Sequence, residues 1–489
     1  MSKGAHLGAK VRVIRRRQGM TQKQLAELLG ISGSYLNLIE HGRRPLPSDL
    51  LIKLVTKFQL DLKELGADED ARMVADLLEA LSDPIFDEHE LNSADVRELV
   101  GAHPSMANAL LTLYRGYKDS HESAENMALQ LLNSADPASE GKGRSRRSAS
   151  HERSYPPPEE VNDLVRRHNN HFPGLEEGAA KVRRDCRLET TDRYPSMVRY
   201  LSQTHGIAVN VVPLGANQGA VRRFDPQRRQ LTLSELLPPR SRHFQVAHQI
   251  GLLTQSDAMD QVANDRQLTS ESSRKLARVV MANYFAGAVL MPYDAVLEAA
   301  RTTRYDIELL GHRFRTSYEQ VCHRLTTLRR PGAEGVPWHF VRVDIAGNIS
   351  KRFSGSGIRF PRFSGACPRW NVHSAFLTPG NDRVQVERMT DGSTYFCVAK
   401  TVRKDGGGYL GSRALHAIGM GCEIQYAKEI VYADGMDLEN LQTAVPVGTA
   451  CRICERMDCE QRAFPPLQSA LEVDENARGL SFYAPVQSD

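Results

Sequence analysis

Residues 248–252 read His-Gln-Ile-Gly-Leu, an altered form of a zinc-binding pattern. In the intact pattern, His-Glu-x-x-His, two histidines one helical turn apart chelate zinc, and the glutamate polarises the attacking water. Here Gln249 has no carboxylate to act as a base, and Leu252 cannot ligate a metal. Taken alone, His248 fits an ordinary, partly buried histidine on an amphipathic helix. We therefore predict no catalytic residue in this segment.

A second segment, residues 282–292, makes that histidine more informative. Its sequence, Ala-Asn-Tyr-Phe-Ala-Gly-Ala-Val-Leu-Met-Pro, resembles the A-N-x-F-A-x-x-L-L-M-P signature of the ImmA/IrrE metalloprotease family. In that family the signature follows His-Glu-x-x-His, and a glutamate just before it supplies the third zinc ligand. This chain has Val279, Val280 and Met281 there. The resemblance implies a protease scaffold that is kept for binding and is not an enzyme.

Three cysteines form a compact motif, because Cys451, Cys454 and Cys459 stand as C-x2-C-x4-C. Disulfides are rare in cytosolic proteins, and closely spaced thiolates on a turn can converge on one point. We interpret the motif as ligands of a metal or cluster, with plain buried thiols as the alternative. For the fourth ligand Cys367 is the first choice, His373 would give three thiolates and one imidazole, and Cys422 is possible. Four thiolates suit zinc or a 4Fe-4S cluster, so spacing leaves both open.

The N-terminal residues have the pattern of a small helical domain. Apolar positions recur at helical spacing over residues 9–65. Thr21 and Gln24 form a capping box at the start of one helix, and Gly30 begins the tight turn into the next. The run from Thr21 to Pro45 resembles the λ repressor-like (XRE-type) helix-turn-helix DNA-binding domain. A helical module that binds protein instead of DNA is the alternative.

Charge supports the DNA interpretation. Residues 1–60 hold eleven Lys and Arg against three Asp and Glu, whereas residues 61–100 hold three against thirteen. A basic block is what contact with phosphates requires. The side chains that open the recognition helix and can reach base edges in the major groove are Ser32, Gly33, Ser34, Tyr35 and Asn37. Those that would position the DNA backbone are Gln22, Arg43 and Arg44.

The length of the chain predicts several domains. The resemblances and the periodicities imply an all-α λ repressor-like head, a helical middle, and an α+β ImmA/IrrE-like and C-terminal sensor region. Strand-like alternation begins after Val336, with a turn at Gly347-Asn348, and returns at residues 395–402. No apolar leader and no run of about 18 to 20 apolar residues occurs, so we expect a cytoplasmic protein without a membrane partner. We expect the head at residues 5–66 and a helical dimerisation or connector region at 67–135. A basic flexible linker should follow at 136–158 and end in an extended Pro156-Pro157-Pro158 stretch. The degenerate ImmA/IrrE-like domain is expected at 159–330, and an α+β effector domain with the cysteine metal site at 331–489.

Taken together, the motifs resemble one family, the short-chain fatty acyl transcriptional regulators, which are bacterial repressors and activators of propionate, glyoxylate or acetate metabolism. The resemblance covers the head, residues 242–249, the A-N-x-F-A signature, residues 367–373 and residues 451–466. It implies an acyl-CoA effector bound in the central and C-terminal regions. It also implies a 4Fe-4S cluster held by Cys367, Cys451, Cys454 and Cys459, which favours the cluster over zinc.

A pocket for CoA needs Arg or Lys beside its phosphates and an apolar slot at the other end. Candidates are Arg166 and Arg167 near the start of the central domain, and Lys400 with Arg403 on the second predicted strand run. Each also fits an ordinary solvated charge. Lys400 is favoured because it alternates with the apolar residues of its strand.

The mechanism that we infer is ligand-controlled transcription. A homodimer would place two recognition helices in successive major grooves of double-stranded operator DNA. The effector would act through its different affinity for two states of the protein. Two alternatives remain open: an active zinc metallopeptidase of the ImmA/IrrE type that cleaves a partner, and a regulator that senses redox state primarily through its Fe-S centre.

Overall fold

The computed structural model describes most of the chain and divides it into two compact units. Unit 1 comprises Met1–Arg146, Pro361–Ser364 and Cys451–Asp489, and unit 2 comprises Arg147–Phe360 and Gly365–Ala450. The described residues are 20–40, 67–86, 93–118, 157–188, 192–213, 220–362, 365–405 and 413–465, with Val11, Arg15, Arg44, Pro47, Leu50, Lys53, Lys57 and Ser481.

The head in unit 1 has the predicted helix-turn-helix. Thr21 caps α2 (Gln22–Leu29) through the expected capping box with Gln24. Gly30 ends this helix in the left-handed region, at φ 72°, where a glycine avoids the steric cost of a Cβ. The turn leads into α3 (Gly33–Glu40). The buried side chains that hold the two helices together are Val11, Leu25, Ala26, Leu29, Leu36, Ile39 and Leu50.

Three further helical segments of unit 1 pack around a separate core. They are α5 (Ala67–Leu81), α6 (Ser93–Ala102) and residues 104–118, with a short 3-10 turn at η1 (Pro84–Phe86). Their core consists of Leu77, Leu78, Ala80, Leu81, Val96, Val100, Ala107, Leu111 and Tyr114. Ile453 also packs against this core, and Arg452 Nη1 donates to the carbonyl of Ser82 at 2.8 Å. The segment that carries the cysteine motif is therefore in contact with the helices that follow the head.

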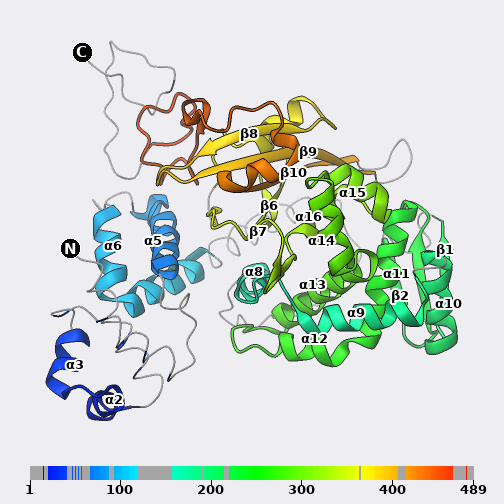
Figure 1. Cartoon of the computed structure of the whole chain (residues 1–489), viewed down its shortest axis with the longest axis horizontal. Helices are drawn as coiled ribbons and strands as arrows, with labels where there is room; N and C mark the ends of the chain where they lie inside the picture. The colour runs from blue at the N-terminus through cyan, green and yellow to red at the C-terminus, as the bar shows by residue number, and fades with distance from the viewer. Residues whose placement is uncertain are drawn as a thin grey trace, which may run out of the picture. The chain divides into compact units, whose positions relative to one another are not determined.

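Unit 2 begins with a layer of helices around α13, which packs against α8, α9, α11, α12 and α16 (Figure 1). The helices of this layer are α8 (Pro157–Arg167), α9 (Pro173–Asp185), α10 (Arg193–His205), α11 (Pro239–Thr254), α12 (Ser256–Ala263), α13 (Glu271–Leu290), α14 (Tyr293–Thr302), α15 (Ile307–Phe314) and α16 (Tyr318–Leu325). The short α17 (Asn371–Ser374) packs instead against β8, β9 and β10. The helices α11 and α13 cross closely at Gly251, because a Cβ there would lie 2.6 Å from the Phe285 ring. This crossing brings the altered zinc motif beside the A-N-x-F-A signature.

The strands of unit 2 form a six-stranded, a three-stranded and a two-stranded sheet, of orders β11-β8-β9-β10-β6-β7, β1-β3-β2 and β4-β5. Their bounds are β1 (Ala208–Val212), β2 (Arg222–Asp225), β3 (Gln230–Ser234), β4 (Arg329–Arg330), β5 (Ala333–Glu334), β6 (His339–Asp344), β7 (Ile349–Ser354), β8 (Arg383–Arg388), β9 (Thr394–Asp405), β10 (Arg413–Glu423) and β11 (Val445–Pro446). The short 3-10 segments are η2 (Ala375–Leu377), η3 (Ile424–Glu429), η4 (Val431–Ala433) and η5 (Leu441–Thr443). The predicted Gly347-Asn348 turn and the predicted strand over residues 395–402 are both present.

The units follow different boundaries from those expected in sequence. One hydrophobic core runs from Phe172 to Ala444 and joins the helical layer to one face of the six-stranded sheet, so residues 159–330 and the following strands are not separately packed. Pro157 and Pro158 open α8 instead of extending a linker, because the fixed φ of proline suits the first helical turn. The rest of the predicted linker lies outside the described residues. In the described part of the chain no single helix could cross a membrane, although α13 and α14, bent by 66° at their junction, together meet the length and composition required.

Candidate functional site

The recognition helix α3 presents a polar surface. Ser32, Gly33, Ser34 and Asn37 are exposed, and Tyr35 is half-buried. Gln22 Nε2 donates to Asn37 Oδ1 at 3.1 Å, so the first residue of α2 orients a predicted base-reading side chain. Ser32 has a local role as well, because its hydroxyl accepts the amide N–H of Tyr35 at 3.1 Å and so caps the helix.

A buried ion pair supports this arrangement and was not predicted. Arg15 donates to both carboxylate oxygens of Glu40, at 2.6 and 3.0 Å, and Gln22 Nε2 donates to Glu40 Oε2 at 2.8 Å. The acidic side chain at the end of α3 gave no periodic signal, so sequence reasoning passed over it. Of the two arginines predicted to position the DNA backbone, Arg44 is exposed and Arg43 lies outside the described residues.

The altered zinc motif forms a buried polar site on α11. His248 is 3% exposed, and Asn283 Oδ1 on α13 accepts from its Nδ1 at 3.0 Å. Nε2 has no hydrogen-bond partner among the described residues. Burial, and secondarily the charge of Arg222, lowers the pKa of His248 to about 4. The imidazole is therefore neutral at pH 7, with Nε2 as an available acceptor.

Gln249, which stands where the intact motif has its catalytic glutamate, pairs with an arginine. Gln249 Oε1 accepts from Arg222 Nη1 at 2.7 Å, and burial lowers the pKa of that arginine. At the expected third-ligand position Met281 is fully buried in the core, whereas Val279 is 43% exposed. Within the described ranges no group of three His, Cys, Asp or Glu side chains is placed to hold a metal ion. This arrangement has the amide of Gln249, paired with Arg222, at the position that the glutamate holds in the intact motif.

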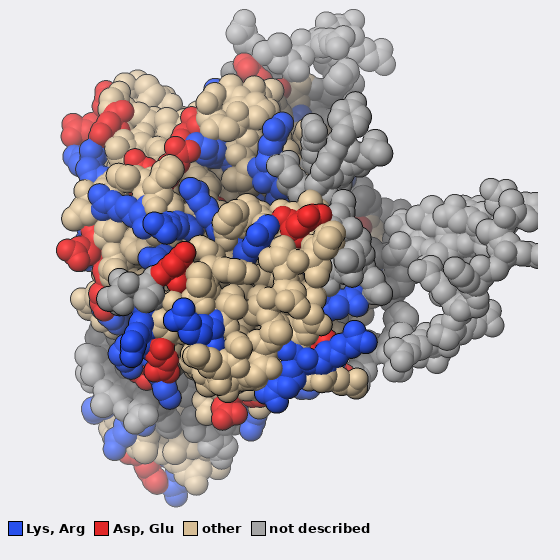
Figure 2. Space-filling view, turned by 90° about the vertical axis from the view of Figure 1, so that its right-hand side faces the viewer, with Lys and Arg blue, Asp and Glu red and all other residues tan. Residues whose placement is uncertain are grey.

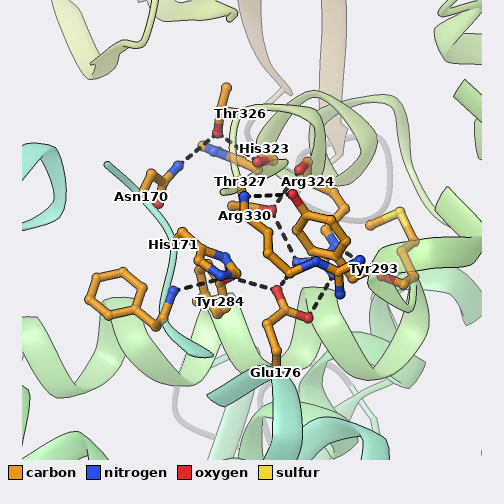
Figure 3. Close-up of polar contacts among 12 residues, drawn as sticks. Asn170, His171, Glu176, Tyr284, Tyr293, His323, Arg324, Thr326, Thr327 and Arg330 are labelled. Atoms are coloured by element: carbon orange, nitrogen blue, oxygen red, sulfur yellow. Dashed lines mark hydrogen bonds and ion pairs between the residues drawn. The ribbon is translucent and has the colours of Figure 1, made fainter. Parts of the chain in front are cut away.

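A buried ion pair fixes the helices around this site (Figure 3). Arg324 on α16 donates to both oxygens of Glu176 on α9, at 2.6 and 2.9 Å. The Tyr284 hydroxyl, next to Asn283 on α13, donates to Glu176 Oε1 at 2.6 Å. Arg324 Nε also donates to the carbonyl of Met291 at 2.8 Å. These bonds tie α9, α13 and α16 together and hold the helix that carries Asn283 in place.

The cysteine motif lies in an irregular segment organised by Arg462. Its guanidinium donates to the carbonyls of Cys451 at 2.7 Å and Cys454 at 2.8 Å. Cys454 is buried, Cys451 and Cys459 are half-buried, and none of the three forms a disulfide. Burial raises the pKa of the Cys454 thiol. The donor chemistry of the three thiols fits a thiophilic metal or cluster. In the described residues the three are not grouped as ligands of one ion.

The fourth-ligand candidates occupy different environments. The amide N–H of Cys367 donates to the carbonyl of Thr449 at 3.1 Å, and its Sγ accepts from the Gly448 N–H at 3.5 Å. Thr449 stands two residues before Cys451 in the sequence. Cys422, in contrast, is fully buried in the large core, on the other face of the sheet from the core that contains Cys367. Burial lowers the pKa of His373. The choice of Cys367 as the fourth ligand stays a prediction.

The residues predicted to bind CoA phosphates are not brought together. Lys400 Nζ is paired with both Glu308 and Asp382, and Arg167 Nη1 pairs with Asp265 at 3.0 Å. Arg403 is exposed on the face of β9 opposite to Lys400, because adjacent strand residues alternate. Arg166, the remaining candidate, pairs with Asp163.

Basic residues are common elsewhere on unit 2 and do not mark a site by their number. Figure 2 shows many Lys and Arg side chains on the side that carries α10, β1, α11 and β2, with Asp and Glu interspersed among them. Local charge balance is therefore a better guide to an anion site than the abundance of cations.

Three family models match the chain. A helix-turn-helix model matches residues 11–65, an IrrE N-terminal-like model matches residues 202–326, and a model described as short-chain fatty acyl coenzyme A regulator, C-terminal, matches residues 327–483.

Curated relatives match almost the whole chain. The HTH-type transcriptional regulator PrpR of Mycobacterium tuberculosis is 40% identical over 476 residues, which are 96% of this chain and 94% of that protein. The propionyl-CoA carboxylase regulator of Cereibacter sphaeroides is 38% identical over 490 residues, covering 99% of each. A solved Mycobacterium tuberculosis transcriptional regulator superposes with a TM-score of 0.63 at 42% identity, covering 66% of this chain and 98% of that one. With its helix-turn-helix head and IrrE-like scaffold, the chain belongs to the family of short-chain fatty acyl coenzyme A transcriptional regulators.

Proposed function

We propose that this chain is a sequence-specific transcriptional regulator of short-chain acyl metabolism whose DNA affinity is controlled by an acyl-CoA. The observation that carries the DNA-binding part is the exposed polar face of α3, with Asn37 held by Gln22 on the preceding helix. Such a helix reads base edges while basic residues around it contact phosphates. The name of the Cereibacter sphaeroides relative and the matching C-terminal family model support acyl metabolism as the regulated process. DNA as partner also favours a cytoplasmic location.

Two substitutions in the head test the DNA-binding proposal. Asn37→Ala should cost about 1 to 3 kcal/mol at the operator and relax its sequence preference, because a base contact is lost. Arg44→Ala should weaken binding to all sequences alike and reduce the slope of log affinity against log salt by about one. Fluorescence anisotropy on operator and scrambled duplexes at several salt concentrations measures both effects. Wild-type binding by both variants would remove α3 and its flank from the mechanism, and Lys275→Ala on unit 2 is the matched control.

For the acyl-CoA, the degenerate protease site supplies one end of a binding site. His248 is neutral, and its Nε2 is a buried acceptor without a described partner. Leaving such a group unpaired costs about 1 to 3 kcal/mol, which a ligand N–H recovers. The pantetheine arm of CoA has two amide N–H groups. We therefore place this arm near His248 and Asn283.

The cysteine segment is proposed to hold a 4Fe-4S cluster, with zinc as the alternative. Cys451, Cys454 and Cys459 would supply three thiolates and Cys367 the fourth, and Arg462 fixes the backbone of the first two. When bound, a cluster supplies redox sensitivity in addition to a structural cross-link. Ile453 and Arg452 contact the α5 region. A conformational change of the cysteine segment would therefore be transmitted through these contacts to the helices that follow the head.

A homodimer is proposed to form through helical residues 104–118. One apolar stripe of this helix is buried, but a second stripe contains Met106, 62% exposed, and Leu113, 71% exposed. Two heads joined by this helix would match a two-fold symmetric operator. Leu113→Glu should raise the dimer dissociation constant about tenfold or more, because a charge would be buried at the interface.

Analytical ultracentrifugation measures that change, with Asn108→Glu on the exposed polar side of the same helix as the control. A Leu113→Glu protein that dimerises like the wild type would show that another part of the chain covers this stripe.

Two alternatives to the overall proposal remain: an active metallopeptidase, which would need zinc at His248, and a regulator that responds primarily to the redox state of the cluster.

A further inference from the structure

Three of four neighbouring strands of the six-stranded sheet, β7, β6 and β9, place Lys or Arg side chains on one face, with β10 between β6 and β9. Lys351 on β7 is directly opposite Arg342 on β6. Arg342 is in turn directly opposite Ile418 on β10. Ile418, His416 and Ala414 alternate along β10 and so share one face, and Ala414 is directly opposite Lys404 on β9. Directly paired residues point to the same side, so these basic groups share a face. It is the face that α16 covers, because the His323 and Phe340 rings lie 4.3 Å apart.

One carboxylate from α16 faces this group of cations. Glu319 Oε1 accepts from Arg342 Nη1 at 2.8 Å and from Lys351 Nζ at 3.0 Å. Lys404 Nζ lies 3.5 Å from Glu319 Oε2. Among the ion pairs of the described residues, Glu319 is the only carboxylate that contacts these three cations. The cation cluster, defined as Arg342, Lys351 and Lys404, therefore has an excess of positive charge.

The neighbouring titratable side chains do not neutralise the positive charge of the cation cluster. Asp344 lies two residues after Arg342 on β6, and its Oδ1 accepts the backbone N–H groups of Ala346 and Asn348 in the β6–β7 turn. His323 and His416 border the cluster, and burial lowers the pKa of both, although the hydrogen bond with Glu319 acts in the opposite direction at His323. Like charges on neighbouring strands are destabilising. Such a cost is offset when an anion binds between them.

The contrast with Lys400 shows why this position, and not the one favoured from sequence, fits an anion. Lys400 has two carboxylate partners, Glu308 and Asp382, for a single positive charge. The cation cluster has one carboxylate for three positive charges. Lys351 and Lys404 are also 43% and 51% exposed, so a ligand can reach them.

We propose that the cation cluster of Arg342, Lys351 and Lys404 binds the phosphate groups of a phosphorylated ligand, which under the function proposed above are those of the acyl-CoA. The site is defined by charge excess and by the shared sheet face, and it takes a ligand with two or more negative charges. Glu319 gathers the three cations around one carboxylate before the ligand arrives. The identification of the ligand as CoA rests on the proposed function, whereas the anion site does not.

Calorimetric titration of the full-length protein tests the assignment with three probes: propionyl-CoA, adenosine 3′,5′-bisphosphate and S-propionyl-pantetheine, which lacks the phosphates. Lys351→Ala and Lys404→Ala should each weaken propionyl-CoA and the bisphosphate about tenfold, the usual effect of one charge-assisted contact. Neither should change the binding of the pantetheine thioester. His248→Ala should do the reverse, weakening the thioester and leaving the bisphosphate unchanged. Lys275→Ala, an exposed lysine paired with Glu271, is the control.

The possible failures are distinguishable. If wild-type protein binds propionyl-CoA and both lysine variants bind it equally well, the anion site is refuted while the effector proposal stands. If the wild type binds the bisphosphate through Lys351 and Lys404 but binds no acyl-CoA, the anion site stands and the effector is wrong. If the variants change only the affinity for DNA, the cluster contacts nucleic acid, and the proposed ligand site is overturned.

Discussion

Replacing Arg324 with Ala should lower the free energy of unfolding by about 3 to 5 kcal/mol, because it leaves the Glu176 carboxylate charged and unpaired in the core. Arg324 is 2% exposed and makes a two-pronged bond to Glu176, with a further bond to the Met291 carbonyl. Urea unfolding monitored by circular dichroism measures the change. Lys275→Ala breaks a fully exposed ion pair and should leave the midpoint unchanged.

The loss can be assigned to the unpaired charge by a second variant. In Arg324→Met combined with Glu176→Leu both charges are absent, so most of the stability should return. A double variant as unstable as Arg324→Ala would show that packing, not charge, is responsible. A single variant within about 1 kcal/mol of the wild type would contradict the assignment of Arg324 as a structural centre.

The same pair predicts the direction of the pH dependence. Burial acts to raise the pKa of Glu176, but Arg324 and Tyr284 outweigh it and place the pKa below its ordinary value of 4.5. A carboxyl whose pKa is lower in the folded state contributes stability above the unfolded value and loses it as pH falls through the folded one. The wild type should therefore lose stability below about pH 4.5, and Arg324→Ala should lose less over the same range.

Removing any one of Cys451, Cys454 and Cys459 should abolish the metal centre, because a four-ligand site that loses one thiolate has an open and oxidisable position. Cys367→Ala should behave in the same way. Cys186 and Cys322 are buried in the large core, and their replacement by Ala should leave the metal content unchanged. Anaerobically purified protein should contain about four iron and four sulfide per chain, or one zinc and no sulfide if the centre is a zinc site.

Metal and sulfide assays with absorbance spectra measure this result and also separate the alternatives. Undiminished metal in Cys451→Ala would refute both the cluster and the zinc version. Stoichiometric zinc that persists when all three motif cysteines are replaced would place a metal at His248 and revive the metallopeptidase. Loss of the cluster together with weaker operator binding would agree with the contacts of Ile453 and Arg452 to the α5 region.

The sequence alone determined the parts of this protein whose signals are local. The capping box of Thr21 and Gln24, the left-handed Gly30 and the turn at Gly347 each depend on a few adjacent residues, and the structure has all three. The family was also predictable, because its motifs are contiguous runs, and the relatives confirm it. The altered zinc motif could be recognised from the missing carboxylate of Gln249.

Only the tertiary structure decided which charges are neutralised and which are not. Lys400 alternates correctly on its strand, but Glu308 and Asp382, which pair with it, are 92 and 18 residues away in sequence. The cation cluster has no sequence signature, since its members lie on β7, β6 and β9 and only the register of the sheet brings them to one face. The pairing of Arg324 with Glu176 likewise joins residues 148 positions apart. Helical and strand periodicity report which side of an element is buried, but a charge balance depends on partners that only folding brings within a few ångströms.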